Sequence, residues 1–216
     1  MEHCMENKKI YAALTGDIIK SSKLSPQQLE EVRKTLSRAI KTLEKALDKK
    51  FLIGDIDFYR GDGWQLLLDD PALSLRTALF LRAALISTGL CDTRISVGVG
   101  TVDSIDKKKI SKSTGMAFEF SGTGLDRLTK RSFMIVSGIL TPQKLEISVF
   151  ELCDAIVQNW TKRQTEAVFW ALQGLDHSQI AENMRPLTKR QTVTRMLNGA
   201  HWFQIEETLI RYEYTK

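Results

Sequence analysis

Cysteine and histidine are both scarce in this chain, since its 216 residues contain only three of each. Cys4, Cys91 and Cys153 are widely spaced and include no CxxC pair, which argues against a disulfide framework and against a zinc site. Isolated thiols of this kind are typical of a reducing compartment. The three histidines show no metal-ligand spacing either, so we assign them no catalytic role.

Long apolar runs are missing as well. No stretch approaches the ~18 apolar residues that indicate a membrane-spanning helix, and the opening MEHCMENKK lacks the apolar core of a signal peptide. The excess of positive charge is small, because 31 Lys and Arg stand against 26 Asp and Glu. Such a balance permits a nucleic-acid partner without requiring one. We therefore expect a cytoplasmic protein that has no membrane partner.

What the chain does contain is a run of helix-start signals between residues 161 and 200. The capping-box pattern, in which an N-cap oxygen and the side chain three residues later satisfy each other's free amides, occurs there three times. The pairs are Thr161 with Gln164, Asp176 with Gln179, and Thr188 with Gln191. They predict three short helices, of which the second covers residues 178–184 and the third residues 189–200.

The third predicted helix has two different faces. Val193, Met196, Leu197 and Ala200 recur at helical spacing and form its inward face. Its outward side chains are cationic or hydrogen-bonding, and no Asp or Glu occurs in residues 183–204. Such a helix, preceded by a short helix and a turn, is typical of a helix-turn-helix that holds phosphates and reads base edges of double-stranded DNA. The expected DNA contacts are Arg185, Lys189, Arg190, Gln191, Thr194, Arg195 and Asn198.

Two points qualify this interpretation. The turn at residues 185–188 is about two residues longer than the tightest helix-turn-helix turn, so the crossing of the two helices can differ. The same three helices also suit a non-catalytic protein-interaction module whose basic residues are only solvated. Because helix-turn-helix proteins usually bind pseudo-palindromic DNA as dimers, the DNA-binding interpretation predicts a homodimer.

The first 140 residues alternate between strand-like and helix-like segments. Strands are expected at residues 10–19, within 51–70 as a hairpin that turns at Gly61-Asp62-Gly63, at 93–104 and at 132–138. Helices are expected to begin at Ser25-Pro26, at Pro71 and at Ser113, and Gly89 should end the second of them. The order β-α-β-β-α-β indicates an α+β fold with a ferredoxin-like sheet that carries its helices on one face.

Four segments of this region, together with residues 161–200, resemble known families. YAALTGDIIKSSKL, FYRGDGWQLLL, TRISVGVGTV and GMAFEFSGTGLD occur in the order and spacing of the SatD family. They also resemble a divergent class III nucleotidyl cyclase or GGDEF-type domain, and residues 161–200 resemble the helix-turn-helix of sigma-factor region 4. The resemblance implies a nucleotidyl cyclase-like domain at 8–140, a linker helix at 141–159 and a helix-turn-helix DNA-binding domain at 160–216.

The cyclase resemblance also implies a site. In class III cyclases two aspartates, one at the end of the first strand and one at the hairpin tip, bind two divalent ions, and Asp17 and Asp62 match them here. Carboxylate oxygens suit Mg²⁺ or Mn²⁺, and a nucleotide phosphate would then contact the neighbouring loops. The implied nucleotide contacts are Gly16, Ile18, Ser21, Gly61 and Arg127. A Gly-Asp pair is also common in ordinary turns, where Gly supplies backbone freedom and Asp hydrogen-bonds the nearby backbone. The two aspartates therefore have a purely structural interpretation too.

The predicted helix that follows residue 113 departs from the cyclase pattern. Glu119 stands where cyclases have the Asn that orients the ribose, and Thr123 stands where they have a phosphate-stabilising Arg. Loss of such a cation lowers the rate of phosphoryl transfer by roughly three or more orders of magnitude. Arg127, one helical turn further on, is a candidate substitute. We therefore expect a DNA-binding transcriptional regulator with a degenerate cyclase-like sensor or dimerisation domain. The alternative is a Mg²⁺- or Mn²⁺-dependent nucleotidyl cyclase or nucleotide-processing enzyme.

Overall fold

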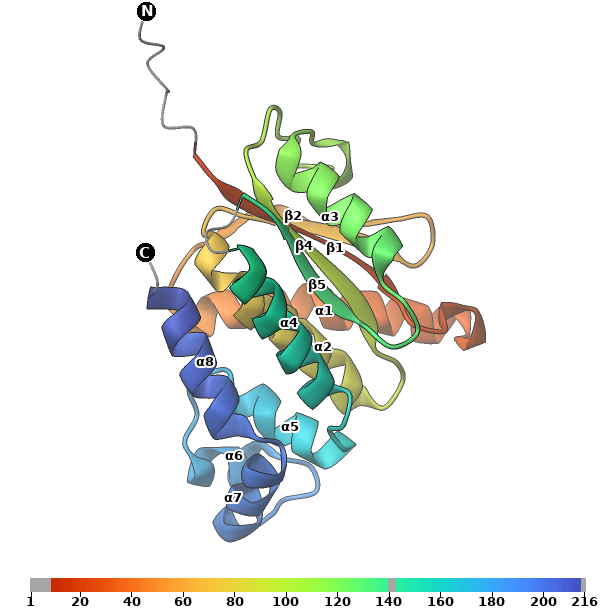
Figure 1. Ribbon diagram of the computed structural model, residues 1–216. Helices are drawn as coiled ribbons and strands as arrows, with labels where there is room; N and C mark the ends of the chain where they lie inside the picture. The colour runs from red at the N-terminus through yellow and green to blue at the C-terminus, as the bar shows by residue number, and fades with distance from the viewer. Residues whose placement is uncertain (1–8, 140–142, 215–216) are drawn as a thin grey trace, which may run out of the picture.

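A computed structural model describes residues 9–139 and 143–214. Within these ranges the fold is mixed α+β, with a five-stranded sheet and eight α-helices (Figure 1). The strands are β1 (Tyr11–Ile18), β2 (Leu52–Tyr59), β3 (Gly63–Leu68), β4 (Thr93–Gly100) and β5 (Met134–Gly138). The helices are α1 (Pro26–Ala46), α2 (Ser74–Thr88), α3 (Met116–Arg127), α4 (Gln143–Val157), α5 (Lys162–Ala171), α6 (His177–Asn183), α7 (Arg190–Gly199) and α8 (Trp202–Tyr214).

The sheet has the strand order β2-β3-β1-β4-β5. The first four strands are antiparallel to their neighbours, and β5 is added parallel to β4. With α1 after β1 and α2 after β3, these four strands follow the β-α-β-β-α-β order that the sequence predicts. The register places Asp17 opposite Gly63 of β3 on one side and opposite Arg94 of β4 on the other.

Helices cover both faces of the sheet, so the prediction that they share one face is wrong for α3. Leu14 and Val97 belong to the cluster that α1, α2 and α4 bury, whereas Ala13 packs with Ala117 and Phe118 of α3 on the opposite face. The physical reason lies in β4, which has glycine where α3 crosses it. A Cβ added at Gly98 would lie 2.0 Å from the Ala117 carbonyl oxygen, so only glycine lets α3 approach the sheet so closely.

Of the six helix starts that the sequence predicts, three are confirmed at their N-caps, and the α-helices predicted from Pro71 and Ser113 begin three residues later, at Ser74 and Met116. Ser25, Thr161 and Asp176 all form complete capping boxes at the N-termini of α1, α5 and α6. The expected box of Thr188 with Gln191 is absent, because α7 begins one residue later with Lys189 as its N-cap. The Thr188 amide instead donates to the Ala181 carbonyl at 3.4 Å and so closes the turn between α6 and α7.

The four C-terminal helices lie below the sheet (Figure 1), where α5 and α8 contact α2 and hold α6 and α7. Phe169 of α5 stacks on Phe80 of α2 with a centroid separation of 4.8 Å, and Glu213 of α8 forms an ion pair with Arg76. One cluster of buried apolar side chains extends without interruption from β1 to α8. The domain limits at 140 and 160 stay a prediction, and residues 140–142 lie outside the described residues.

A fully buried arginine joins three parts of this core. The Nε and Nη2 atoms of Arg82 on α2 donate to the carboxylate of Asp92 at 3.1 and 2.7 Å, and Nη1 donates to Asp154 of α4 at 2.7 Å. Asp154 also accepts the backbone amide of Phe133 at 2.7 Å. The two carboxylates raise the pKa of the Arg82 guanidinium against the opposing effect of its desolvation, which is the largest single influence. The guanidinium therefore stays charged and fixes α2, the start of β4 and α4 together.

We expect Arg82→Ala to lower the free energy of unfolding by about 3–5 kcal/mol, because it leaves two carboxylates without their buried cation. Urea denaturation followed by circular dichroism measures this change. The matched control is Arg38→Ala, which removes an exposed ion pair with Glu31 and should change stability by less than about 1 kcal/mol. Equal losses in the two variants would contradict the role assigned to Arg82.

Candidate functional site

The antiparallel pairing of β1 with β3 brings the two predicted metal ligands together. Asp17 lies near the end of β1, and Asp62 lies in the turn that leads into β3. The amide of Ile18 donates to the Asp62 carbonyl at 3.2 Å, and the hydroxyl of Ser21 donates to the Asp62 carboxylate at 2.6 Å. Four of the predicted residues, Asp17, Ile18, Ser21 and Asp62, are therefore neighbours in the fold.

The two predicted glycines have structural roles at this end of the sheet. Gly61, with a φ of +89°, lies in the hairpin turn, which is formed by residues 60–62 because Gly63 already pairs with Tyr59. Gly16 makes room for a buried indole, since a Cβ added there would lie 2.4 Å from the ring of Trp64. Their predicted contacts with a nucleotide stay a prediction.

The sequence analysis missed Arg94, which is the closest ionic partner of Asp17. Its Nε donates to Asp17 Oδ1 at 2.8 Å and its Nη2 to Asp17 Oδ2, so both carboxylate oxygens are engaged. The hydrogen bonds with Asp17 are the largest cause that raises the pKa of Arg94, and the charges of Asp17 and Asp62 add to them. Arg94 could have been found from the sequence only if the register between β1 and β4 were known.

A divalent cation at Asp17 would have to compete with this guanidinium. The two carboxylates are of the right chemistry for Mg²⁺ or Mn²⁺, but Asp17 already accepts two charge-assisted hydrogen bonds. No group of three or more His, Cys, Asp or Glu side chains is placed to hold a metal ion in the part of the chain that the structure describes. Water or a nucleotide would therefore have to supply the remaining ligands.

The C-terminal end of α3 borders the same site. The carbonyl of Leu128 accepts a hydrogen bond from Arg94 Nη1 at 3.4 Å, and the exposed Arg127 precedes it directly. Glu119 and Thr123 are exposed on α3, and the Thr123 hydroxyl donates to the carbonyl of Glu119 at 2.8 Å. Arg127 therefore directly precedes the residue whose carbonyl Arg94 binds, while Thr123 uses its hydroxyl within its own helix.

The second candidate site is the outward face of α7, at the end of the molecule far from α3 (Figure 1). Val193 and Leu197 are buried beneath it, as the periodicity predicts. Five of the seven predicted DNA contacts have exposed side chains on or just before α7, namely Lys189, Arg190, Gln191, Arg195 and Asn198. Thr194 is half-buried, and its hydroxyl shares a 2.9 Å hydrogen bond with His177 Nδ1 of α6.

The long turn between α6 and α7 is held by α5. Arg163 donates to the carbonyls of Arg185 and Pro186 at 3.0 and 3.2 Å, and Glu166 accepts the Arg185 amide at 2.7 Å. The exposed Arg185 side chain also donates to carbonyls at the end of α6, including that of Glu182 at 2.7 Å. These contacts give the longer turn a defined position relative to both helices.

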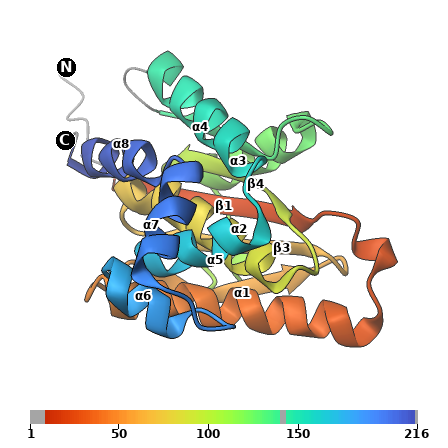
Figure 2. The ribbon, with the colours of Figure 1, turned by 90° about the horizontal axis from the view of Figure 1, so that it is seen from below.

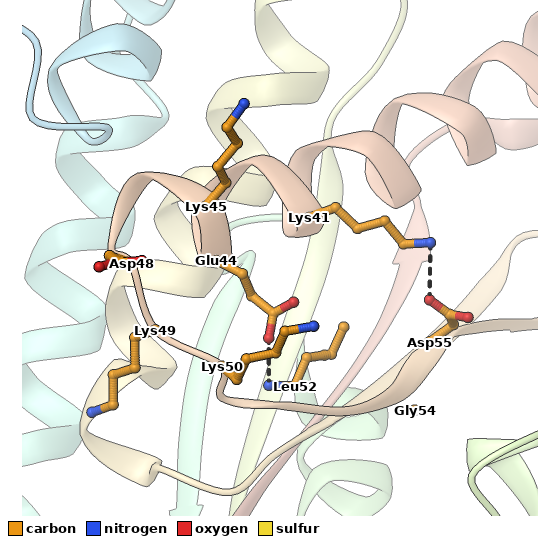
Figure 3. Close-up of a pocket in the computed structure, with 9 residues that line it drawn as sticks. All are labelled: Lys41, Glu44, Lys45, Asp48, Lys49, Lys50, Leu52, Gly54 and Asp55. Carbon is orange, nitrogen blue, oxygen red and sulfur yellow. Dashed lines mark hydrogen bonds and ion pairs between the residues drawn. The ribbon is translucent and has the colours of Figure 1, made fainter.

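A cavity of about 590 Å³ lies away from both sites, between the C-terminal end of α1 and β2 (Figure 3). Lys41 forms an ion pair with Asp55 at 3.1 Å, and Glu44 accepts the amides of Phe51 and Leu52 at 3.0 Å each. Lysines at this end of a helix complement its negative dipole. The lysines of this cavity therefore have a structural explanation, and none of the predicted site residues lines it.

Comparison with known proteins gives a likeness among solved structures alone. No family model matches the chain, and no curated protein matches its sequence. Among solved structures it is similar to the crystal structure of the guanylyl cyclase Cya2, with 17% sequence identity and a TM-score of 0.43. The match covers 61% of this chain and 76% of that one. A likeness of this size carries no argument about function.

No helix within residues 9–139 and 143–214 is both long and apolar enough to cross a membrane. This agrees with the sequence, in which no long apolar run occurs.

We expect Arg94→Ala to increase the effect of Mn²⁺ on thermal stability, because the substitution frees both Asp17 oxygens for a cation. The Mn²⁺-dependent rise in melting temperature should exceed that of the wild type by at least about 2 °C, which at this chain length corresponds to roughly 1 kcal/mol. Differential scanning fluorimetry in Mn²⁺ and in EDTA measures it. Asp17→Asn and Asp62→Asn should each abolish the rise, while the exposed Arg131→Ala should leave it unchanged. A rise that persists in Asp17→Asn would show that the cation binds elsewhere.

Proposed function

We propose that this protein is a DNA-binding transcriptional regulator in which α6, the following turn and α7 form a helix-turn-helix. The observation that carries the proposal is the outward face of α7, where cationic and amide side chains are exposed together over a buried apolar face. No carboxylate occurs between residues 183 and 204, so nothing on this helix repels a phosphate backbone.

The types of side chain on α7 suit both parts of DNA recognition. Arg190 and Gln191 lie in its first turn, the part of a recognition helix that contacts base edges. Arginine pairs with guanine, and Gln or Asn pairs with adenine, through two hydrogen bonds each. Lys189 and Arg195 add cationic groups for phosphates, and Asn198 continues the same face one turn later.

In this proposal the sheet domain is a degenerate cyclase-like sensor or dimerisation unit that binds a nucleotide, with or without Mg²⁺ or Mn²⁺. The adjacency of Asp17 and Asp62 supports a retained ligand site, and the SatD resemblance supports the pairing of such a domain with a helix-turn-helix. The continuous core through α2 supports a mechanical connection between the two regions.

We expect the double variant Arg190→Ala and Arg195→Ala to bind duplex DNA more weakly and with a flatter salt dependence. Each lost phosphate contact should reduce the slope of log affinity against log salt by about one, so the double variant should lose up to about two. Fluorescence anisotropy with a pool of random duplexes at several salt concentrations measures both effects. The matched control is Lys45→Ala with Lys50→Ala, which removes two exposed cations at the C-terminal end of α1 and just after it. Unchanged binding by the folded Arg190 and Arg195 variant would contradict the DNA interface.

The second candidate function is a divalent-metal-dependent nucleotidyl cyclase or nucleotide-processing enzyme. The observation that favours it is the same closeness of Asp17 to Asp62. Two observations argue against this function. Glu119 and Thr123 supply neither of the two groups that cyclases use on this helix. Arg94 occupies both carboxylate oxygens of Asp17.

We expect cyclic nucleotide formation from ATP or GTP with Mn²⁺ to be far below the ~1 s⁻¹ of ordinary enzymes. Chromatographic product analysis with Asp17→Ala as the background measures it. A rate near that of ordinary enzymes, lost in Asp17→Ala, would place the enzyme first.

A third function, a protein-interaction module, would be favoured if the wild type were not retained on heparin and did not bind duplex DNA.

A further inference from the structure

The outer face of α4 presents an apolar stripe that the described chain covers only in part, since Val149 and Ile156 pack against the core while the leucines beside them are exposed. Leu145 and Leu152 have 63% and 67% of their surface exposed, and Val149 and Ile156 are half-buried beside them. Figures 1 and 2 show α4 on the outside of the molecule in both views. The inner face of the same helix is buried through Phe150, and Asp154 is tied to Arg82, so the stripe is held in place.

The spacing and residue types of this stripe match those of a two-stranded coiled coil. Leu145, Val149, Leu152 and Ile156 are separated by four, three and four residues, which is the alternation of d and a positions in a heptad. Leucine occupies both d positions and a β-branched residue occupies both a positions. In parallel coiled coils this distribution favours two helices over three or four.

The residues beside the stripe also suit pairing with an identical helix. Ser148 and Ala155 are small and uncharged, so a second helix can approach α4 closely on that side. No charged residue interrupts the stripe, and thus no like charges would face each other across a two-fold axis. The described α4 has 15 residues, or roughly 22 Å, so the contact is short and needs support from neighbouring surfaces.

We propose that the stripe of Leu145, Val149, Leu152 and Ile156 binds the same stripe of a second copy of this chain, with the two α4 helices parallel. Another occupant fits less well. Residues 1–8 read MEHCMENK, which is mostly polar and supplies no matching apolar repeat. The occupant that supplies leucine at d and a β-branched residue at a in the same register is α4 itself.

Parallel pairing has a geometric consequence for the rest of the molecule. Because α4 leads through Trp160 into α5, two parallel α4 helices place both copies of α5–α8 at the same end of the dimer. A two-fold DNA site needs two recognition helices on one side. The dimer itself does not depend on DNA binding, so the proposal and the proposed function can fail separately.

The first test measures the oligomeric state without DNA. Sedimentation velocity over a range of concentrations should show a wild-type dimer of about twice the 24.5 kDa chain mass. Leu145→Glu with Leu152→Glu should weaken the dimer at least ~30-fold, as expected for residues at the centre of an interface. The matched control is Leu187→Glu with Ile210→Glu, which changes two exposed apolar residues elsewhere and should dimerise like the wild type.

The second test measures the orientation of the helices. In a parallel pair Leu152 faces its own copy, so Leu152→Cys should form a cross-linked dimer under mild oxidation. Glu151→Cys, which lies off the stripe on the exposed surface, should cross-link no more than the wild type. A wild type that is monomeric at every concentration would overturn the proposal and leave another occupant for α4. A dimer that resists the two glutamates, or one that cross-links equally through both cysteine variants, would also overturn it.

Discussion

The buried guanidinium of Arg82 is the interaction on which the other features of this structure depend. Its bond to Asp92 fixes the residue before β4, and the next residue, Thr93, accepts the Trp64 indole N–H and donates to the Asp17 carbonyl at 2.7 Å. Arg94 follows and holds the Asp17 carboxylate. The geometry of the acidic site at the sheet edge is therefore connected, one residue at a time, to a charge in the core. Through Asp154 the same charge also sets the position of α4.

The helix that carries Arg82 is buried on all sides, which explains why its sequence lacks a polar face. The sheet covers one side of α2, and α1, α4 and α5 cover the others. A ligand that binds one arrangement of the sheet more tightly than another shifts the populations of the two arrangements. The shift reaches the attached helices only if the element that connects them to the sheet moves with it. In this chain that element is α2, since Phe80 contacts α5 and Arg76 contacts α8.

Some of the fold and part of the candidate site followed from the sequence, because they depend on local chemistry. Ser25, Thr161 and Asp176 act within one helical turn, so their capping boxes could be predicted from spacing alone. The closeness of Asp17 and Asp62 followed from a short hairpin and the resemblance that aligned them. Thr188 fits the same pattern but caps no helix, because its amide closes the turn between α6 and α7 instead.

The sequence by itself determined the order of the elements up to α7 and both the buried and the cationic face of α7, since each depends on residues close together in the chain. Only the tertiary structure decided that α3 lies on the opposite face of the sheet, that Arg94 pairs with Asp17, and that Arg82 is a core charge. Those three features depend on strand register and on contacts between residues 10 or more positions apart, such as Arg82 with Asp92. Side-chain periodicity carries no information about either, because it reports which face of an element is buried and not what lies against that face.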